Sequence, residues 1–136
     1  MNYKELQQLH EAHRNTGKGL MILGFPCNNF GAQEPGSNAE IQAFAAKKGA
    51  TFTILGKVEC ENMPKTHPLW TYLRASVPAG ILGQSIKWNF TKWACNAEGV
   101  PVHRFGPTDN PLSFKSKIVH LLGDSNHSSE SKGQKK

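Results

Sequence analysis

The chain has 136 residues, which suits one domain of ordinary size, and 38% of them are apolar, enough for the core of a soluble protein. It contains no apolar run near the roughly 20 residues of a membrane span and no signal peptide at its start, which predicts a cytoplasmic protein. The net charge of +6 indicates a solvated basic surface or one that attracts anions; without a basic run interleaved with aromatics, nucleic acid is not expected as a partner.

The first half of the chain predicts two helices and two strands. Apolar spacing indicates a helix over about 2–15, ended by Gly17, and the apolar run 20–25 indicates a strand buried on both faces. A polar loop follows, and Ser37 with Glu40 forms a capping-box pattern that begins a helix ended by Gly49. Residues 51–58 are typical of a second strand.

The second half predicts a helix, a hairpin and a last helix. Pro68 suits a first helical turn, and strands over about 90–95 and 100–105 are joined by a turn that ends at Gly99. Residues 111–122 predict the closing helix, and the Ser-, Gly- and Lys-rich tail 123–136 is expected to be disordered.

This order of elements predicts an α/β protein with a mixed sheet flanked by helices. Helices between strands imply parallel crossovers, and the late hairpin adds an antiparallel edge. The order is similar to that of the thioredoxin fold, except that such a sheet usually opens with a strand before its first helix. We therefore expect residues 1–122 to form one thioredoxin-like domain whose first strand or strands are missing.

Three segments carry a family resemblance. GFPCNNFGAQEPGSNAEI (24–41) resembles the FPCNQFGxQEPG signature of glutathione peroxidases, KWNFTKW (87–93) resembles WNFxKF, and GVPVHRFGPT (99–108) resembles GxPxxRYGPT. The resemblance covers about residues 2–122, and motifs of this length are far more specific than a lone glycine pattern.

The resemblance implies peroxide reduction by a thiolate or selenolate, with glutathione as the reducing co-substrate and no bound cofactor or metal. The family stabilises that anion with a glutamine, a tryptophan N–H and an asparagine amide, which fall on Gln33, Trp88 and Asn89 here. Each is a neutral donor that can favour an anion without titrating itself. Without the motifs, Gln33 would be interpreted as a solvated loop residue, Trp88 as a core residue and Asn89 as a turn or cap residue. The motifs favour the functional interpretation instead.

The three cysteines are not expected to supply the nucleophile. Their odd number and the lack of a CxxC spacing argue against a disulfide framework or a zinc site and favour a reducing compartment. Cys27 follows a buried strand and is expected to be an inert thiol, as its position in the family motif also implies. Glu59 and Glu61 should raise the pKa of Cys60, and no role is assigned to Cys95.

The family's reactive cysteine or selenocysteine lies in an NVASxCGxT-like segment, which this chain lacks. Met1 to Tyr3 already match the start of the helix that follows that segment. Ala45 and Ala46 stand where members with an internal resolving cysteine carry it. We therefore expect an N-terminally truncated selenoprotein whose codon for selenocysteine was read as a stop, and little activity from the chain alone.

The resemblance also bears on the branch of the family. HPLW (67–70) also fits the family pattern, and only seventeen residues, 71–87, separate it from the WNF motif, as in the monomeric phospholipid-hydroperoxide type. We therefore expect a monomer that acts on hydrogen peroxide and lipid hydroperoxides. Contact with a membrane surface is compatible with the positive charge. Two alternatives stay open: a non-catalytic thioredoxin-like remnant, and a thioredoxin-dependent peroxidase in which Cys60 would serve a disulfide relay.

Overall fold

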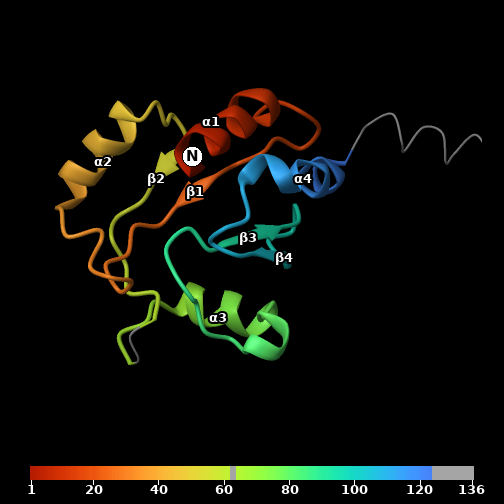
Figure 1. Ribbon diagram of the computed structural model, residues 1–136. Helices are drawn as coiled ribbons and strands as arrows, with labels where there is room; N and C mark the ends of the chain where they lie inside the picture. Colours follow the sequence, from red (N-terminus) through yellow and green to blue (C-terminus); the bar gives the residue numbers. More distant parts are fainter. Residues whose placement is uncertain (62–63, 124–136) are drawn as a thin grey trace, which may run out of the picture.

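The computed structural model describes residues 1–61 and 64–123 (Figure 1). The elements run α1, β1, α2, β2, α3, β3, β4 and α4, with two short 3₁₀ helices, η1 (Gly80–Leu82) and η2 (Pro111–Phe114). The tail predicted to be disordered lies, apart from Gly123, outside the described residues, and the domain boundary at residue 122 stays a prediction. No helix within the described ranges is long and apolar enough to cross a bilayer.

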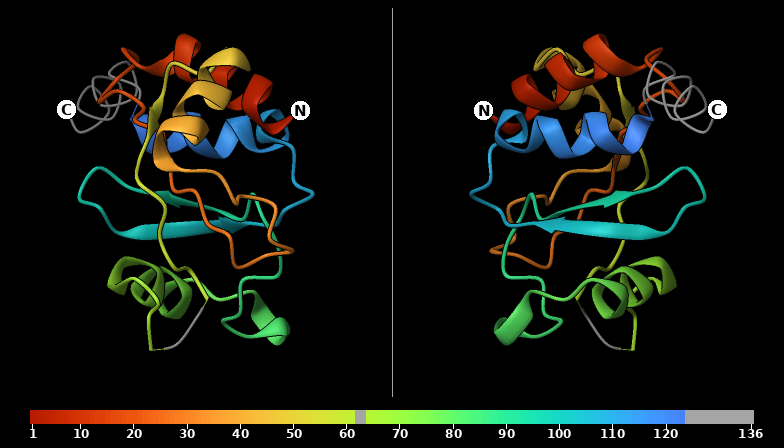
Figure 2. Two further views of the ribbon diagram at one scale, coloured as in Figure 1. Left: turned by 90° about the vertical axis from the view of Figure 1, so that its left-hand side faces the viewer. Right: turned by 90° about the vertical axis from the view of Figure 1, so that its right-hand side faces the viewer.

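Helices cover both sides of the β3–β4 hairpin. α1 (Asn2–His13) and α4 (Lys115–Leu122) lie on one side, and α3 (Pro68–Ser76) lies on the other (Figure 2). The main core cluster fills the first of these interfaces and contains Leu9, Ala94, Phe105, Phe114 and Ile118. Within it the rings of Phe105 and Phe114 stack with centroids 3.8 Å apart and 5° between their planes.

Local sequence signals set the helix starts. In α2 (Asn38–Lys47) the Ser37 hydroxyl accepts from the Glu40 N–H at 3.2 Å, as the capping box predicts. The Glu40 carboxylate, however, accepts from the Ser37 hydroxyl, not from the Ser37 backbone. α3 begins at Pro68 as expected, and the predicted closing helix is η2 followed by α4, because its first turn takes the tighter 3₁₀ form.

The hairpin forms as predicted. β3 (Lys92–Cys95) pairs antiparallel with β4 (Pro101–Phe105), with an irregularity between Ala94 and Cys95. The turn closes through bonds from Asn96 N–H to the Val100 carbonyl (2.8 Å) and from Gly99 N–H to the Asn96 carbonyl (3.0 Å). Gly99 has a φ of 82°, the conformation for which glycine was expected there.

The first strand corrects the sequence prediction. β1 covers only Leu23–Gly24 and pairs in parallel with β2 (Thr53–Ile54). It is not buried on both faces: Leu23 is 46% exposed and the preceding Met21 is 76% exposed. The reason is that, among the described residues, β1 has only β2 as a neighbour, so its second edge is uncovered.

The expected mixed sheet is therefore divided in two. One half is the parallel pair β1–β2 and the other is the antiparallel pair β3–β4. Both kinds of pairing that the sequence predicts are present, with helices around them. The described residues do not join the two halves by hydrogen bonds between β1 and β3.

Candidate functional site

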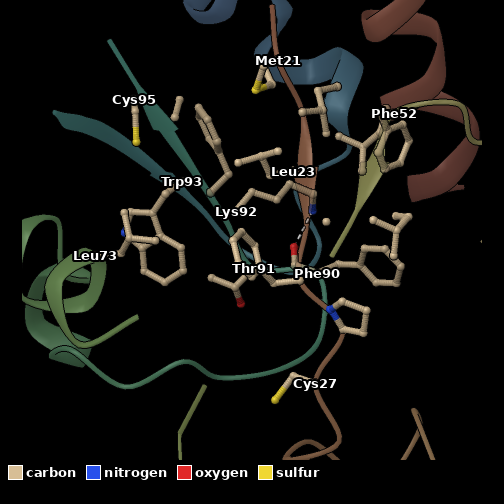
Figure 3. A pocket seen from close by; sticks show the side chains of 18 of the residues that line it. Met21, Leu23, Cys27, Phe52, Leu73, Phe90, Thr91, Lys92, Trp93 and Cys95 are labelled. Atoms are coloured by element: carbon tan, nitrogen blue, oxygen red, sulfur yellow. Dashed lines mark hydrogen bonds between the residues drawn. The ribbon is translucent and has the colours of Figure 1, made fainter. Parts of the chain in front are cut away.

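A large cavity separates the two half-sheets. Its volume is about 1080 Å³, and its wall includes Leu23 of β1, Lys92 and Trp93 of β3, and Phe52 next to β2. Figure 3 shows the side chains of these two sheet edges around a common space, with Cys27 at its lower end. We call this space the inter-sheet cavity. Most of its lining is apolar, so a polar group on its wall must find a local partner.

Gln33 and Asn89 meet on the wall of this cavity. Gln33 lies in the loop between β1 and α2, and Asn89 lies just before β3. Asn89 Nδ2 donates to Gln33 Oε1 at 3.0 Å and to the Phe30 carbonyl at 3.1 Å. Both N–H bonds of the Asn89 amide are thus engaged. The Gln33 amide nitrogen, in contrast, donates to no group among the described residues.

Trp88 completes the group and stands beside the same loop. Its ring centroid lies 6.5 Å from that of Phe30, and the side chain is 44% exposed. A Cβ built on Gly31 would come within 2.7 Å of the Trp88 ring, so only glycine permits this close approach. Within the described residues the indole N–H of Trp88 makes no hydrogen bond. It remains available to a bound group.

Two unusual backbone conformations flank the site. Ala32 (φ 49°) and Phe90 (φ 62°) are the non-glycine residues of the described chain that adopt positive φ. Ala32 immediately precedes Gln33, and Phe90 immediately follows Asn89. Such conformations persist where surrounding structure holds them, and they cluster at functional sites. The strain therefore supports a functional reading of the two neighbouring amides.

The arrangement suits the binding of an anion or a polarised oxygen. Gln33 Nε2 and Trp88 Nε1 are uncharged donors beside a mainly apolar cavity, where a hydrogen bond is stronger than in water. Asn89 fixes the Gln33 side chain, and its own donors become available only if one existing bond breaks. Among the described residues, no cluster of His, Cys, Asp or Glu is suited to hold a metal.

Cys27 is buried, as expected, and hydrogen-bond donors lie beside its sulfur, while its inertness stays a prediction. Hydrogen bonding from the Cys60 thiol, together with the backbone N–H groups of Asn29 and Cys60, lowers the pKa of Cys27 to about 6 despite burial and Glu59. The pKa of Cys60 is raised, first by its bond to Cys27 and by burial, and also by Glu59 and Glu61 as predicted. Sequence reasoning missed this contact, since no motif relates positions 33 residues apart.

The comparisons with known proteins bear on this geometry. The family model described as glutathione peroxidase matches residues 1–74. The chain is 48% identical to the probable phospholipid hydroperoxide glutathione peroxidase of Citrus sinensis over 122 residues, which cover 89% of this chain and 71% of that protein. The chain belongs to the glutathione peroxidase family.

Other family members agree. The phospholipid hydroperoxide glutathione peroxidase of Pongo pygmaeus is 44% identical over 123 residues, which span 90% of this chain and 61% of that one. The crystal structure of Trgpx in its apo form superposes with a TM-score of 0.71 at 28% identity, over 89% of this chain and 70% of that chain. The T. cruzi GPX1 structure gives 0.68 at 30% identity, covering 91% and 72%. The predicted thioredoxin-like α/β fold is thereby confirmed for this glutathione peroxidase family protein.

Proposed function

We propose that this protein is a thiol-dependent peroxidase that reduces hydrogen peroxide and organic or lipid hydroperoxides with glutathione, in defence against oxidative stress. The observation that carries the proposal is that Gln33, Trp88 and Asn89 line one wall of the inter-sheet cavity. The N–H donors of Gln33 and Trp88 have no hydrogen-bond partner among residues 1–61 and 64–123. These are the three side chains that the family motifs assign to stabilising the reactive anion.

The printed sequence contains no NVASxCGxT segment, so the nucleophile is the part that the donors lack. The uncovered edges of β1 and β3 face the cavity, and an extended strand carrying that segment would fit between them. Such a strand would join the two half-sheets and bring its reactive residue to the Gln33 and Trp88 donors. Without it the 136 residues should turn over peroxide with glutathione slowly or not at all, since the donors have no anion to stabilise.

The chemistry follows from an activated thiolate or selenolate. Its attack on one peroxide oxygen breaks the O–O bond, releases an alcohol or water, and leaves a sulfenic or selenenic acid. One glutathione thiol then attacks this acid and displaces water, which forms a mixed disulfide or a selenenyl sulfide between the protein and glutathione. A second glutathione thiolate then attacks the glutathione sulfur, which releases glutathione disulfide and restores the nucleophile. In this scheme the N–H donors of Gln33 and Trp88 stabilise the thiolate or selenolate each time it is regenerated.

We propose that the substrates of this protein include lipid hydroperoxides as well as hydrogen peroxide. Several relatives are named for phospholipid hydroperoxides, and the short 71–87 segment resembles that of the family's monomeric type, whose uncovered site can admit large lipid hydroperoxides. The net charge of +6 would favour an anionic membrane surface and the anionic glutathione molecule. A monomer in the cytoplasm remains the prediction for its assembly and location.

The test compares the chain as printed with the same chain preceded by an NVASxCGxT segment, the pattern that carries the reactive cysteine in the family. Glutathione consumption is followed with hydrogen peroxide and with phosphatidylcholine hydroperoxide. We expect turnover of both by the extended protein and background rates when its introduced cysteine is changed to serine. An extended protein that folds but reduces neither peroxide with glutathione would refute the proposal. Faster turnover with thioredoxin would instead favour the alternative reductant.

A further inference from the structure

Cys27 and Cys60 form a close pair that the proposed glutathione chemistry does not use. Cys27 lies three residues after β1, and Cys60 lies in the segment between β2 and α3. Both are buried, with 7% and 4% of their surface exposed, and they share one core cluster with Ile86. Both residues are hydrogen-bonded to the same Asn29 side chain, and both thiols are free. The two cysteines are therefore neighbours in the core although they are far apart in the sequence.

Asn29 and the backbone hold this pair in position. Asn29 Oδ1 accepts from the Cys60 N–H at 2.9 Å and from the Cys27 thiol at 3.0 Å, while the Asn29 N–H donates to Cys27 Sγ at 3.4 Å. The Val58 N–H donates to the Pro26 carbonyl at 2.9 Å, which ties the two segments together. A disulfide requires its cysteines to be close and correctly directed before oxidation. These contacts hold the two cysteine-bearing segments next to each other.

The surroundings give the two thiols different reactivity. The pKa of Cys27 is lowered to about 6, chiefly because the Cys60 thiol donates to it and because two backbone N–H groups do so as well. Burial, the Glu59 carboxylate and the acceptor Asn29 Oδ1 oppose this ionisation. The pKa of Cys60 is raised, since Cys60 is the donor and faces Glu59 and Glu61. The two pKa values are therefore shifted in opposite directions, so that Cys27 ionises more readily than Cys60.

A small oxidant can reach the pair. Both cysteines line the inter-sheet cavity, and Figure 3 shows the Cys27 side chain at its lower end. The volume of about 1080 Å³ far exceeds that of a hydrogen peroxide molecule. Although little of either thiol is exposed, both cysteines border the cavity and are not enclosed on all sides by other side chains. Cys95 is exposed on β3 and lines the same cavity, but within the described residues no hydrogen bond links it to Cys27 or Cys60.

We propose that Cys27 and Cys60 form a second redox site, a dithiol that hydroperoxides oxidise to a disulfide. The Cys27 thiolate attacks one peroxide oxygen; the O–O bond breaks, Cys27 becomes a sulfenic acid, and hydroxide or alkoxide leaves and takes up a proton. The Cys60 sulfur then attacks the Cys27 sulfur, water leaves, and the disulfide forms. Each cycle consumes one hydroperoxide and oxidises two thiols by two electrons. A dithiol reductant restores the pair.

The site is tested on the whole 136-residue chain, reduced and then treated with hydrogen peroxide without glutathione. Mass spectrometry should show the loss of two hydrogens and a peptide link between Cys27 and Cys60, with one thiol left per chain. Cys95→Ala is the matched control and should change neither the link nor its rate. Cys60→Ala should instead accumulate a sulfenic acid on Cys27 that dimedone traps. Circular dichroism checks that each variant is folded.

The pH profile separates this site from fortuitous oxidation. The rate of link formation should be flat above pH 7 and about tenfold lower at pH 5, following the Cys27 thiolate fraction. Oxidation that proceeds as fast in Cys27→Ala, a link that uses Cys95, or no link in the unmodified chain would overturn the inference. The unmodified chain decides the matter even if a variant fails to fold. Since the assay contains neither glutathione nor an added nucleophile, its failure would leave the proposed peroxidase function untouched.

Discussion

Replacing Asn29 by alanine should destabilise the protein more than its half-exposed position suggests. The Asn29 side chain accepts from the Cys60 N–H at 2.9 Å and the Glu61 N–H at 3.2 Å, and its amide nitrogen donates to Glu59. Cys60 is almost fully buried, so its N–H would be left without a partner, at a cost of about 1–3 kcal/mol. Adding about 1 kcal/mol for each bond that water can partly replace gives about 3–5 kcal/mol in total.

The assay is urea unfolding of the reduced chain, followed by tryptophan fluorescence. Asn38→Ala is the matched control, because Asn38 Oδ1 accepts a single backbone bond, from Lys57 at 3.0 Å, on the exposed surface. The Asn38→Ala substitution should lower the free energy of unfolding by only about 0.5–1.5 kcal/mol. If Asn29→Ala unfolds at the same urea concentration as Asn38→Ala, the inference that Asn29 holds the Cys60 segment is refuted.

Three further changes probe the core, the site and the charge. Phe105→Ala removes one ring of the stacked Phe105–Phe114 pair and should lower the free energy of unfolding by about 3–5 kcal/mol in the same urea assay. Gly31→Ala should displace the Trp88 ring, which a Cβ there would meet at 2.7 Å, and shift the fluorescence of that tryptophan; an unchanged spectrum would contradict the close packing. Burial lowers the pKa of Lys92 to about 8 in the folded protein. Between pH 8 and about 10.5 the Lys92 amine is therefore protonated in the unfolded chain and mostly neutral in the folded one. The stability of the unmodified chain relative to Lys92→Met should therefore rise with pH across this window, and a flat difference would exclude the effect.

Local signals in the sequence predicted local structure well. The Ser37 cap, the start of α3 at Pro68 and the turn at Gly99 depend on residues within a few positions of one another, and the structure has all three. The same reasoning failed for β1, which is shorter and more exposed than its apolar run predicts. Whether an apolar segment is buried depends on which distant segments cover it, and the described residues leave one side of β1 uncovered.

The site could be predicted only in part. Motif positions named Gln33, Trp88 and Asn89, and the structure brings these three together on one cavity wall. Their roles in catalysis stay predictions. The contact of Cys27 with Cys60 could not be predicted, because it arises where two loops meet and an asparagine side chain bridges them. Burial alone suggested an inert Cys27, whereas the donors around its sulfur determine the pKa.

The most direct test of the donor set is the pKa of the cysteine supplied by the family's reactive segment in the extended chain. It is measured from the pH dependence of alkylation, read on the peptide that carries this cysteine. We predict a pKa clearly below the ordinary value of about 8.5, raised by Gln33→Ala and by Trp88→Phe, and unchanged by the exposed control Gln84→Ala. An ordinary pKa that neither substitution moves would contradict the account.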